Sequence, residues 1–281
     1  MSEKSVTQNN KPANLYEKIQ KLRLMDDVFM KVVFQDNPEA VQLVIRTITG
    51  KSDLVVKDYH LQYGVVSFVG HSVTLDILAE DANGVIYDIE IQRSSAGASP
   101  KRLRYYSSLI DANYLKKGQS YESLPEKYVI FIMEEDYFKK GEPLYEFVMT
   151  SKGSRRFELG DEQHIMYVNG KNDSDTKLGK LMQDFQETNP DKMYYNELKT
   201  RAKYYKTNEK GDKGMKSVVD EIYEDGEKAG RTEGKAEGKA NTIMSAIRYL
   251  KKSSDKSAVI EQLMGMFDLS REDATKYYMA A

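Results

Sequence analysis

The sequence predicts a mixed α/β fold with a helical C-terminal extension. An early helix over 37–50 is followed by strand-type segments over 54–92. A second helix begins at Pro100, and a continuous apolar segment of strand length follows at 127–134. From residue 177 onward the pattern is helical. The order of helix, strand meander, helix and strand is the basis of the prediction.

Two helices carry clear start and stop signals. Asn37-Pro38 provides an N-cap followed by proline in the first turn, and Gly50 ends the helix. The second helix begins at Pro100, and Gly118 lies past its end. The first helix has an apolar stripe, which is formed by Val41, Val44, Ile45 and Ile48.

The strands are recognised by their composition and length. Leu54–His60 and Tyr63–Val69 read as two separate strands. Lys127–Glu134 contains a continuous apolar run between its charged ends, which is typical of a buried central strand. A short strand is expected at His164–Gly170.

The segment from Val73 to Gln92, VTLDILAEDANGVIYDIEIQ, predicts a hairpin with acids on its strands. Asn83-Gly84 supplies the turn. If residues 82–84 form a three-residue loop, Asp76 falls directly opposite Glu90, because side chains alternate along a strand. A two- or four-residue loop would offset the pair by one position.

Two carboxylates that face each other across a strand pair lie about 4.5–5.5 Å apart at Cβ. They repel unless a cation or a proton lies between them. Alternating polar residues are also the ordinary pattern of a sheet with one solvated face. Leu78 and Ile86 lie on the same face as the acids, so we expect that face to be covered.

The chain is expected to contain four parts. Residues 1–14 are polar and are predicted to be disordered, and 15–222 form the main domain, with a helical subdomain from about residue 177. A charged, glycine-rich linker is expected at 223–240, followed by a small helical tail at 241–281.

The composition excludes several classes of site. There is no cysteine, which removes disulfides and thiolate ligands, and there are only three histidines. Lys and Arg total 42 against 44 acidic residues, a formal charge of −2, so a globally basic nucleic-acid surface is excluded. The N-terminus lacks the apolar core of a signal peptide, and no segment approaches a membrane span. A soluble cytoplasmic protein is expected.

With these segments assembled, the chain resembles the PD-(D/E)XK nuclease superfamily, and within it the PD-(D/E)XK nuclease family transposases, or recombination-promoting nucleases. The resemblance runs from about Leu24 to Glu237. It rests on LMDDVFMKVVF, VTLDILAEDANGVIYDIEIQ, PKRLRYYSSLIDANYLKKGQSYESLPEKYVIFIMEED and MYVNG.

The resemblance implies a restriction-endonuclease-like αβββαβ core, with a mixed central sheet flanked by helices. The metal-binding Asp of the family falls on Asp76, its second acid on Glu90, and its third position on Gln92, where lysine is usual. Glutamine can orient a water molecule but carries no charge. Three acids could complete such a site, and the sequence does not choose among Asp26, Asp27 and Glu39.

The leading hypothesis is metal-dependent hydrolysis of a DNA phosphodiester. Asp76, Glu90 and the Ile91 carbonyl would hold Mg²⁺ or Mn²⁺, with Gln92 positioning the water. Basic residues at the start of the second helix are candidates for phosphate contacts or for an ordinary solvated face, and they are Lys101, Arg102 and Arg104.

Two rival functions use the same fold. One is a catalytically impaired module that binds DNA or a protein partner, which Gln92 and the mild acidity favour. The other is an RNA nuclease acting in defence. Because one site cuts one strand, double-strand cleavage favours a homodimer, with the helices from Asn241 as the expected contact.

Overall fold

The computed structural model describes residues 17–67, 70–207, 242–251 and 255–280. The chain divides into two compact units, one formed by 1–65 with 73–219 and the other by 66–72 with 220–281. The expected disordered N-terminus at 1–14 and the linker at 223–240 lie outside the described residues.

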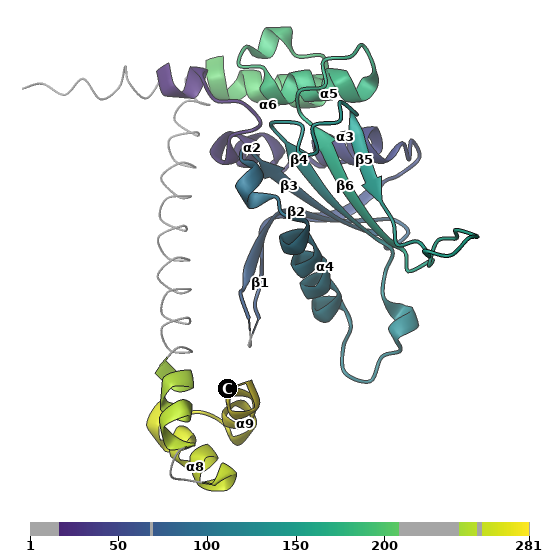
Figure 1. The fold of residues 1–281 in the computed structure, drawn as a ribbon. Coiled ribbons are helices and arrows are strands. Elements are labelled where there is room, and N and C mark those ends of the chain that lie inside the picture. Colours follow the sequence, from purple (N-terminus) through teal and green to yellow (C-terminus); the bar gives the residue numbers. More distant parts are fainter. Residues whose placement is uncertain (1–16, 68–69, 208–241, 252–254, 281) are drawn as a thin grey trace, which may run out of the picture. The chain divides into compact units, whose positions relative to one another are not determined.

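The larger unit contains one mixed six-stranded sheet in the order β1-β2-β3-β4-β6-β5 (Figure 1). The strands are β1 Val56–Val65, β2 Val73–Asp81, β3 Ile86–Gln92, β4 Lys127–Met133, β5 Leu144–Phe147 and β6 Gln163–Asn169. The first three form an antiparallel meander, β3, β4 and β6 are parallel, and β5 pairs antiparallel with β6. The predicted mixed α/β fold with an αβββαβ core is confirmed.

Helices cover both faces of this sheet (Figure 1). Those of the larger unit are α2 Asp27–Phe34, α3 Pro38–Thr49, α4 Pro100–Tyr114, α5 Lys177–Gln186 and α6 Asn196–Thr207, with short 3-10 turns at Ser95–Gly97, Tyr121–Ser123 and Pro190–Lys192. Both predicted helices are present, and the first has the expected caps. Asn37 accepts a hydrogen bond from the Ala40 N–H, and Gly50 ends α3 with a φ of 74°. Ser99 caps the start of α4.

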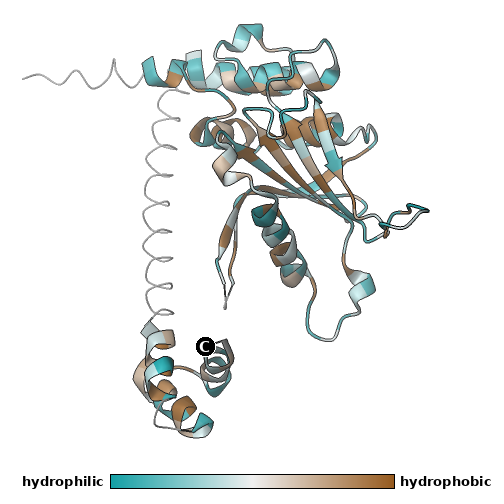
Figure 2. Ribbon diagram, viewed as in Figure 1, coloured by the Kyte–Doolittle hydropathy of each residue, from teal (hydrophilic) through white to brown (hydrophobic). Residues whose placement is uncertain are grey.

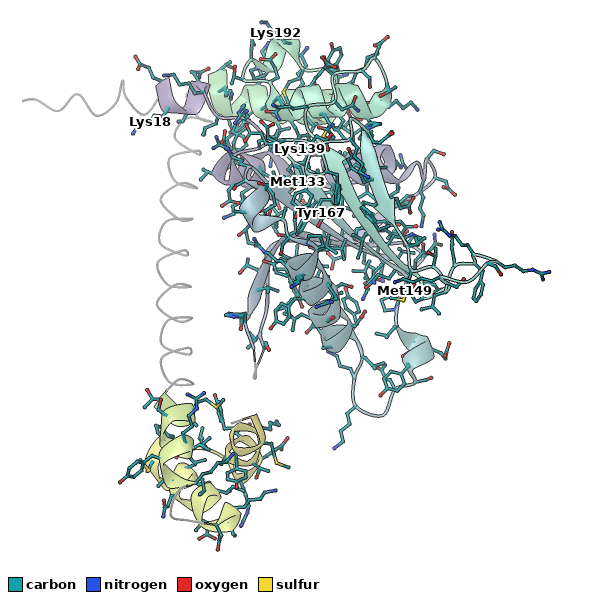
Figure 3. The ribbon with its side chains drawn as sticks, in the orientation of Figure 1. Lys18, Met133, Lys139, Met149, Tyr167 and Lys192 are labelled. Atoms are coloured by element: carbon teal, nitrogen blue, oxygen red, sulfur yellow. The ribbon has the colours of Figure 1, made fainter. Side chains whose placement is uncertain are left out.

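Each face of the sheet has its own hydrophobic core. On one face α2, α3, α5 and α6 pack against the strands, with Phe29, Phe185 and Ile130 fully buried there. On the other face α4 contributes Leu103 and Ile110 to a separate cluster. The central strands are the most apolar part of the ribbon in Figure 2, and Figure 3 shows the side chains packed along them. A buried sheet with two covered faces requires such continuously apolar strands.

One expectation about the strands was wrong, and one strand was missed. Leu54–His60 and Tyr63–Val69 are not separate strands, because the single strand β1 runs from Val56 to Val65. Gln62 adopts a φ of 51° within that strand, and pairing with β2 continues on both sides of it. The edge strand β5 was not expected, and its four residues are too few to give a pattern.

The C-terminal unit contains helical residues at 242–250, α8 at Lys256–Phe267 and α9 at Arg271–Ala280. Its small core includes Ile243, Ile247, Val259 and Leu263. The hydroxyl of Ser270 accepts a hydrogen bond from the Asp273 N–H, which caps the start of α9. No helix among the described residues is both long enough and apolar enough to cross a membrane.

Candidate active site

The hairpin of β2 and β3 has the register that a three-residue loop requires. The Asp81 N–H donates to the Val85 carbonyl at 3.1 Å, which closes the loop of residues 82–84. Ile77 pairs with Ile89, and the same register places Asp76 opposite Glu90. The conditional prediction from the turn is therefore confirmed.

Asp76 and Glu90 are joined through the backbone at the point where the strands separate. The Asp76 N–H donates to Glu90 Oε1 at 3.0 Å, and the Ile91 N–H donates to Asp76 Oδ2 at 2.9 Å. Main-chain groups that could pair in the sheet thus bind the two carboxylates instead. Each acid is held by the backbone of the opposite strand.

The position of Asp76 coincides with a change of packing along β2. Leu75, just before it, belongs to the core under α4, whereas Ile77, just after it, belongs to the core on the other face. Asp76 therefore lies where the strand turns from one core to the other. Leu78 and Ile86 pack beneath α4, so the face that carries the acids is covered, as expected.

Asp88 is a third acid that the sequence reasoning did not assign to the site. Its side chain is completely buried on the same face of β3 as Glu90. Among the described residues, no N–H or O–H group donates to either of its carboxyl oxygens. The Glu90 carboxyl lies beside it, and a hydrogen bond between two carboxyls requires a proton on one of them. The alternation of β3, with Asp88 two residues before Glu90, was the available signal.

Burial and nearby negative charge raise the pKa of all three carboxyls. Burial is the largest cause for Asp76, and the charge of Asp27 adds to it. Burial also holds the pKa of Asp88 and of Glu90 well above the ordinary range, and the neighbouring acids raise both further. Such a cluster favours a proton or a bound cation.

Gln92 lies at the end of β3 beside the 3-10 turn that follows it. A Cβ atom added to Gly97 would overlap Gln92 Oε1 and would come within 3.1 Å of Arg102 Nη1. Because Gly97 has no side chain, the ends of the Gln92 and Arg102 side chains can both approach it. Gln92 continues the face that carries Asp88 and Glu90.

The three basic residues of α4 have different environments. Lys101 and Arg104 are exposed. Arg102 is partly buried, and its guanidinium binds the Gly97 carbonyl and the Tyr106 hydroxyl. The positive charge of Arg102 opposes the rise in pKa of both Asp88 and Glu90.

The three N-terminal acids also have different environments in the structure. Gln62 Nε2 lies 3.1 Å from Asp76 Oδ1 and 3.5 Å from Asp27 Oδ1, so it bridges these two acids. Asp26 instead binds Arg93 at 2.7 Å. Glu39 is exposed in the first turn of α3. Gln62 gave no signal in the sequence, because its position depends on the irregular backbone of β1.

The donor set suits a small divalent cation. Across the described part of the chain, no group of three or more His, Cys, Asp or Glu side chains is arranged to hold a metal ion. Mg²⁺ does not require one, since it is commonly bound by one or two carboxylates together with water and substrate phosphates. Asp76 and Glu90 supply two carboxylates, and the buried oxygens of Asp88 that lack donors lie beside them.

One family model matches part of the chain. Residues 67–185 match the model of the PD-(D/E)XK nuclease family transposases. The matched segment includes Asp76, Glu90 and Gln92 and extends through α4 into α5. No curated protein and no solved structure matches the chain.

Proposed function

Because residues 67–185 match the model of the PD-(D/E)XK nuclease family transposases, we propose that this chain is a metal-dependent endonuclease that hydrolyses DNA phosphodiester bonds. The family match supports a nuclease-related function. The observation that supports hydrolysis is the pair of acids bound to each other's backbone, Asp76 and Glu90, on a covered face of the sheet.

In this proposal Asp76, Glu90 and the Ile91 carbonyl hold Mg²⁺ or Mn²⁺. The ion would lower the pKa of a water molecule and offset charge on the phosphate oxygens. The Ile91 N–H fixes one oxygen of Asp76, and the Asp76 N–H fixes one oxygen of Glu90. Gln92 orients water through its amide, which both donates and accepts hydrogen bonds. Lys101 and Arg104, exposed on α4, contact backbone phosphates.

The test is nicking of supercoiled plasmid with Mg²⁺, with Mn²⁺ and with EDTA. Asp76→Asn is the informative variant, because it keeps the shape of the side chain and removes the charge. The matched control is Asp53→Asn, an exposed aspartate between α3 and β1. We expect metal-dependent nicking that Asp76→Asn abolishes and Asp53→Asn leaves intact. Equal nicking by both variants in pure protein would rule the proposal out.

A second candidate is a domain that keeps the fold and binds DNA or a protein partner without cutting. The neutral Gln92 at the position usually held by lysine favours it. Metal-induced stabilisation separates the two, since a ligand that binds the folded state raises the melting temperature. A rise with Mn²⁺ that Asp76→Asn removes supports the nuclease, and no rise supports the binding domain.

A cleavage assay also determines whether the substrate is DNA or RNA. Single-stranded RNA and supercoiled DNA are offered at equal nucleotide concentrations, and preference for RNA would favour a role in defence. A link to recombination is part of the proposal only through the family. A cytoplasmic location stays a prediction, based on the absence of cysteine.

We also propose a homodimer through the C-terminal helices. Large apolar side chains are exposed there, namely Tyr249, Met266 and Met279. Light scattering of the full chain, compared with a chain ending at residue 240, tests this directly. A full-length monomer would reject it, and a dimer that persists after truncation would move the interface elsewhere.

A further inference from the structure

Arg102 is held in a fixed position at the start of α4. Its Nε and Nη2 donate to the Tyr106 hydroxyl at 2.8 and 2.5 Å, and its Nη1 donates to the Gly97 carbonyl at 2.8 Å. The guanidinium also lies 4.9 Å from the centre of the Tyr106 ring. An arginine whose guanidinium is already held by three hydrogen bonds loses little further conformational freedom when it binds a ligand.

The guanidinium keeps donors to spare. Arginine has five N–H bonds, and the hydrogen bonds to Tyr106 and Gly97 use three of them. The two that remain are one on each terminal nitrogen. A forked pair of this kind suits the oxygens of a phosphate group.

The charge of Arg102 lies near the end of β3 that carries the acids. Gln92 Oε1 and Arg102 Nη1 both approach Gly97, where an added Cβ would overlap Gln92 Oε1 and come within 3.1 Å of Arg102 Nη1. The positive charge of Arg102 opposes the rise in the pKa of Glu90 and of Asp88, which lie on the same face of β3. Gln92 is neutral, so the charge beside the end of β3 on this face comes from α4.

We propose that Arg102 is a catalytic residue that binds the scissile phosphate and supplies the positive charge that Gln92 does not. This inference rests on the proposed nuclease function. It changes the role of Arg102 from one of three surface phosphate contacts to a fixed cation within the site. The substrate group that it recognises is a phosphodiester oxygen.

The decisive experiment is a compensation series in plasmid nicking, with Arg102→Gln, Arg102→Lys, Gln92→Lys and the double variant Arg102→Gln/Gln92→Lys. We expect Arg102→Gln to lower kcat about 100-fold, the size of effect seen when one donor to a developing charge is removed. Arg102→Lys, which keeps the charge but loses the fork, should fall between. Gln92→Lys should restore at least about tenfold to Arg102→Gln, because the same charge then comes from β3.

Two further measurements exclude a merely structural effect. The Mn²⁺-induced rise in melting temperature should persist in Arg102→Gln, because Arg102 is not a metal ligand. Lys192→Met, which removes a cation at the outer surface, is the control and should nick like wild type (Figure 3). If Arg102→Gln does not fold, Arg102→Lys with and without Gln92→Lys carries the test.

The outcomes separate this inference from the proposed function. Nicking that Asp76→Asn abolishes but Arg102→Gln leaves within about threefold would overturn the role of Arg102 alone. Loss of the Mn²⁺ response in Arg102→Gln, or no rescue by Gln92→Lys, would also overturn it. Absence of any Asp76-dependent nicking in wild type would overturn both proposals.

Discussion

The backbone N–H of Asp76 donates a 3.0 Å hydrogen bond to Glu90 Oε1, so the chain that carries one acid holds the side chain of the other. The register of β2 with β3 ends at the Ile77–Ile89 pair, and beyond it this bond and the one from the Ile91 N–H to Asp76 Oδ2 link the two strands. Because the two carboxylates are fixed by backbone, their separation does not depend on flexible side-chain contacts. A bound cation would find them already positioned, which lowers the ordering cost of binding.

The first prediction concerns the pH dependence of stability. The pKa of Asp88 is raised in the folded state, so the folded protein binds more protons than the unfolded chain above the ordinary value of 3.8. Stability is then fully present below that value and falls as the pH rises toward the folded pKa. Asp88→Asn removes this contribution.

Urea unfolding in EDTA at several pH values between 4 and 8 measures the effect. The wild-type free energy of unfolding should fall more steeply over this range than that of Asp88→Asn. Asp53→Asn, whose carboxyl is exposed, should follow the wild-type slope. Parallel slopes for wild type and Asp88→Asn would show that Asp88 ionises normally.

The second prediction concerns the metal. Mn²⁺ at about 100 times its dissociation constant should stabilise the folded state by about 2.7 kcal/mol. At one fixed Mn²⁺ concentration the stabilisation should be larger at pH 8 than at pH 6. The pKa values of Asp76 and Glu90 are raised, so at lower pH protons on these carboxyls compete with the cation. Thermal melts with Mn²⁺ and with EDTA give the difference, and Asp76→Asn should remove it. A shift that is independent of pH would place the metal elsewhere.

The third prediction concerns Gly97. Its φ lies outside the left-handed region, so the backbone accepts alanine, but the added methyl would displace the Gln92 side chain. We expect Gly97→Ala to lower nicking about tenfold or more, because small displacements at a reacting centre have large effects on rate.

The matched control is Gly265→Ala, within α8, where an added Cβ meets open space. It should leave nicking unchanged and stabilise its helix by about 0.5–1 kcal/mol. Circular dichroism melts and plasmid nicking on both variants separate the local effect on the site from a general effect on folding. Full activity in Gly97→Ala would mean that Gln92 has no fixed role.

The fourth prediction concerns Lys206, a buried lysine that joins α6 to the N-terminal segment. Its ammonium donates to the carbonyls of Gln20, Leu22 and Thr188 at 3.2, 2.5 and 2.6 Å. Lys206→Met leaves these acceptors without a donor and should destabilise the domain by about 1–3 kcal/mol. Lys203→Met, which removes an exposed ion pair with Asp191, should cost less than about 1 kcal/mol in the same urea titration.

Burial lowers the pKa of Lys206 to about 8. The unfolded chain therefore binds more protons than the folded one between about pH 8 and the ordinary value of 10.5. Stability should rise with pH across this window in wild type, and this rise should be absent in Lys206→Met. An identical pH dependence in the two proteins would contradict the assignment.

Local signals in the sequence predicted most of the fold. The caps at Asn37 and Gly50 predicted α3, and the apolar run at 127–134 predicted β4, because these features depend on neighbouring residues alone. The sequence did not predict that β1 is continuous. Its irregularity at Gln62 is tolerated because β2 pairs on both sides of it, and such pairing partners lie far away in the chain.

By itself, the sequence predicted the hairpin and made the alignment of Asp76 with Glu90 depend on a three-residue loop, since a turn fixes the register of the strands it joins. The structure has that loop. Only the tertiary structure decided what surrounds that pair. α4 covers the face and brings Arg102 over Gly97 to Gln92, while Gln62 links Asp76 to Asp27. These contacts join segments separated in the chain, and packing of the whole sheet brings them together. No local pattern records that packing.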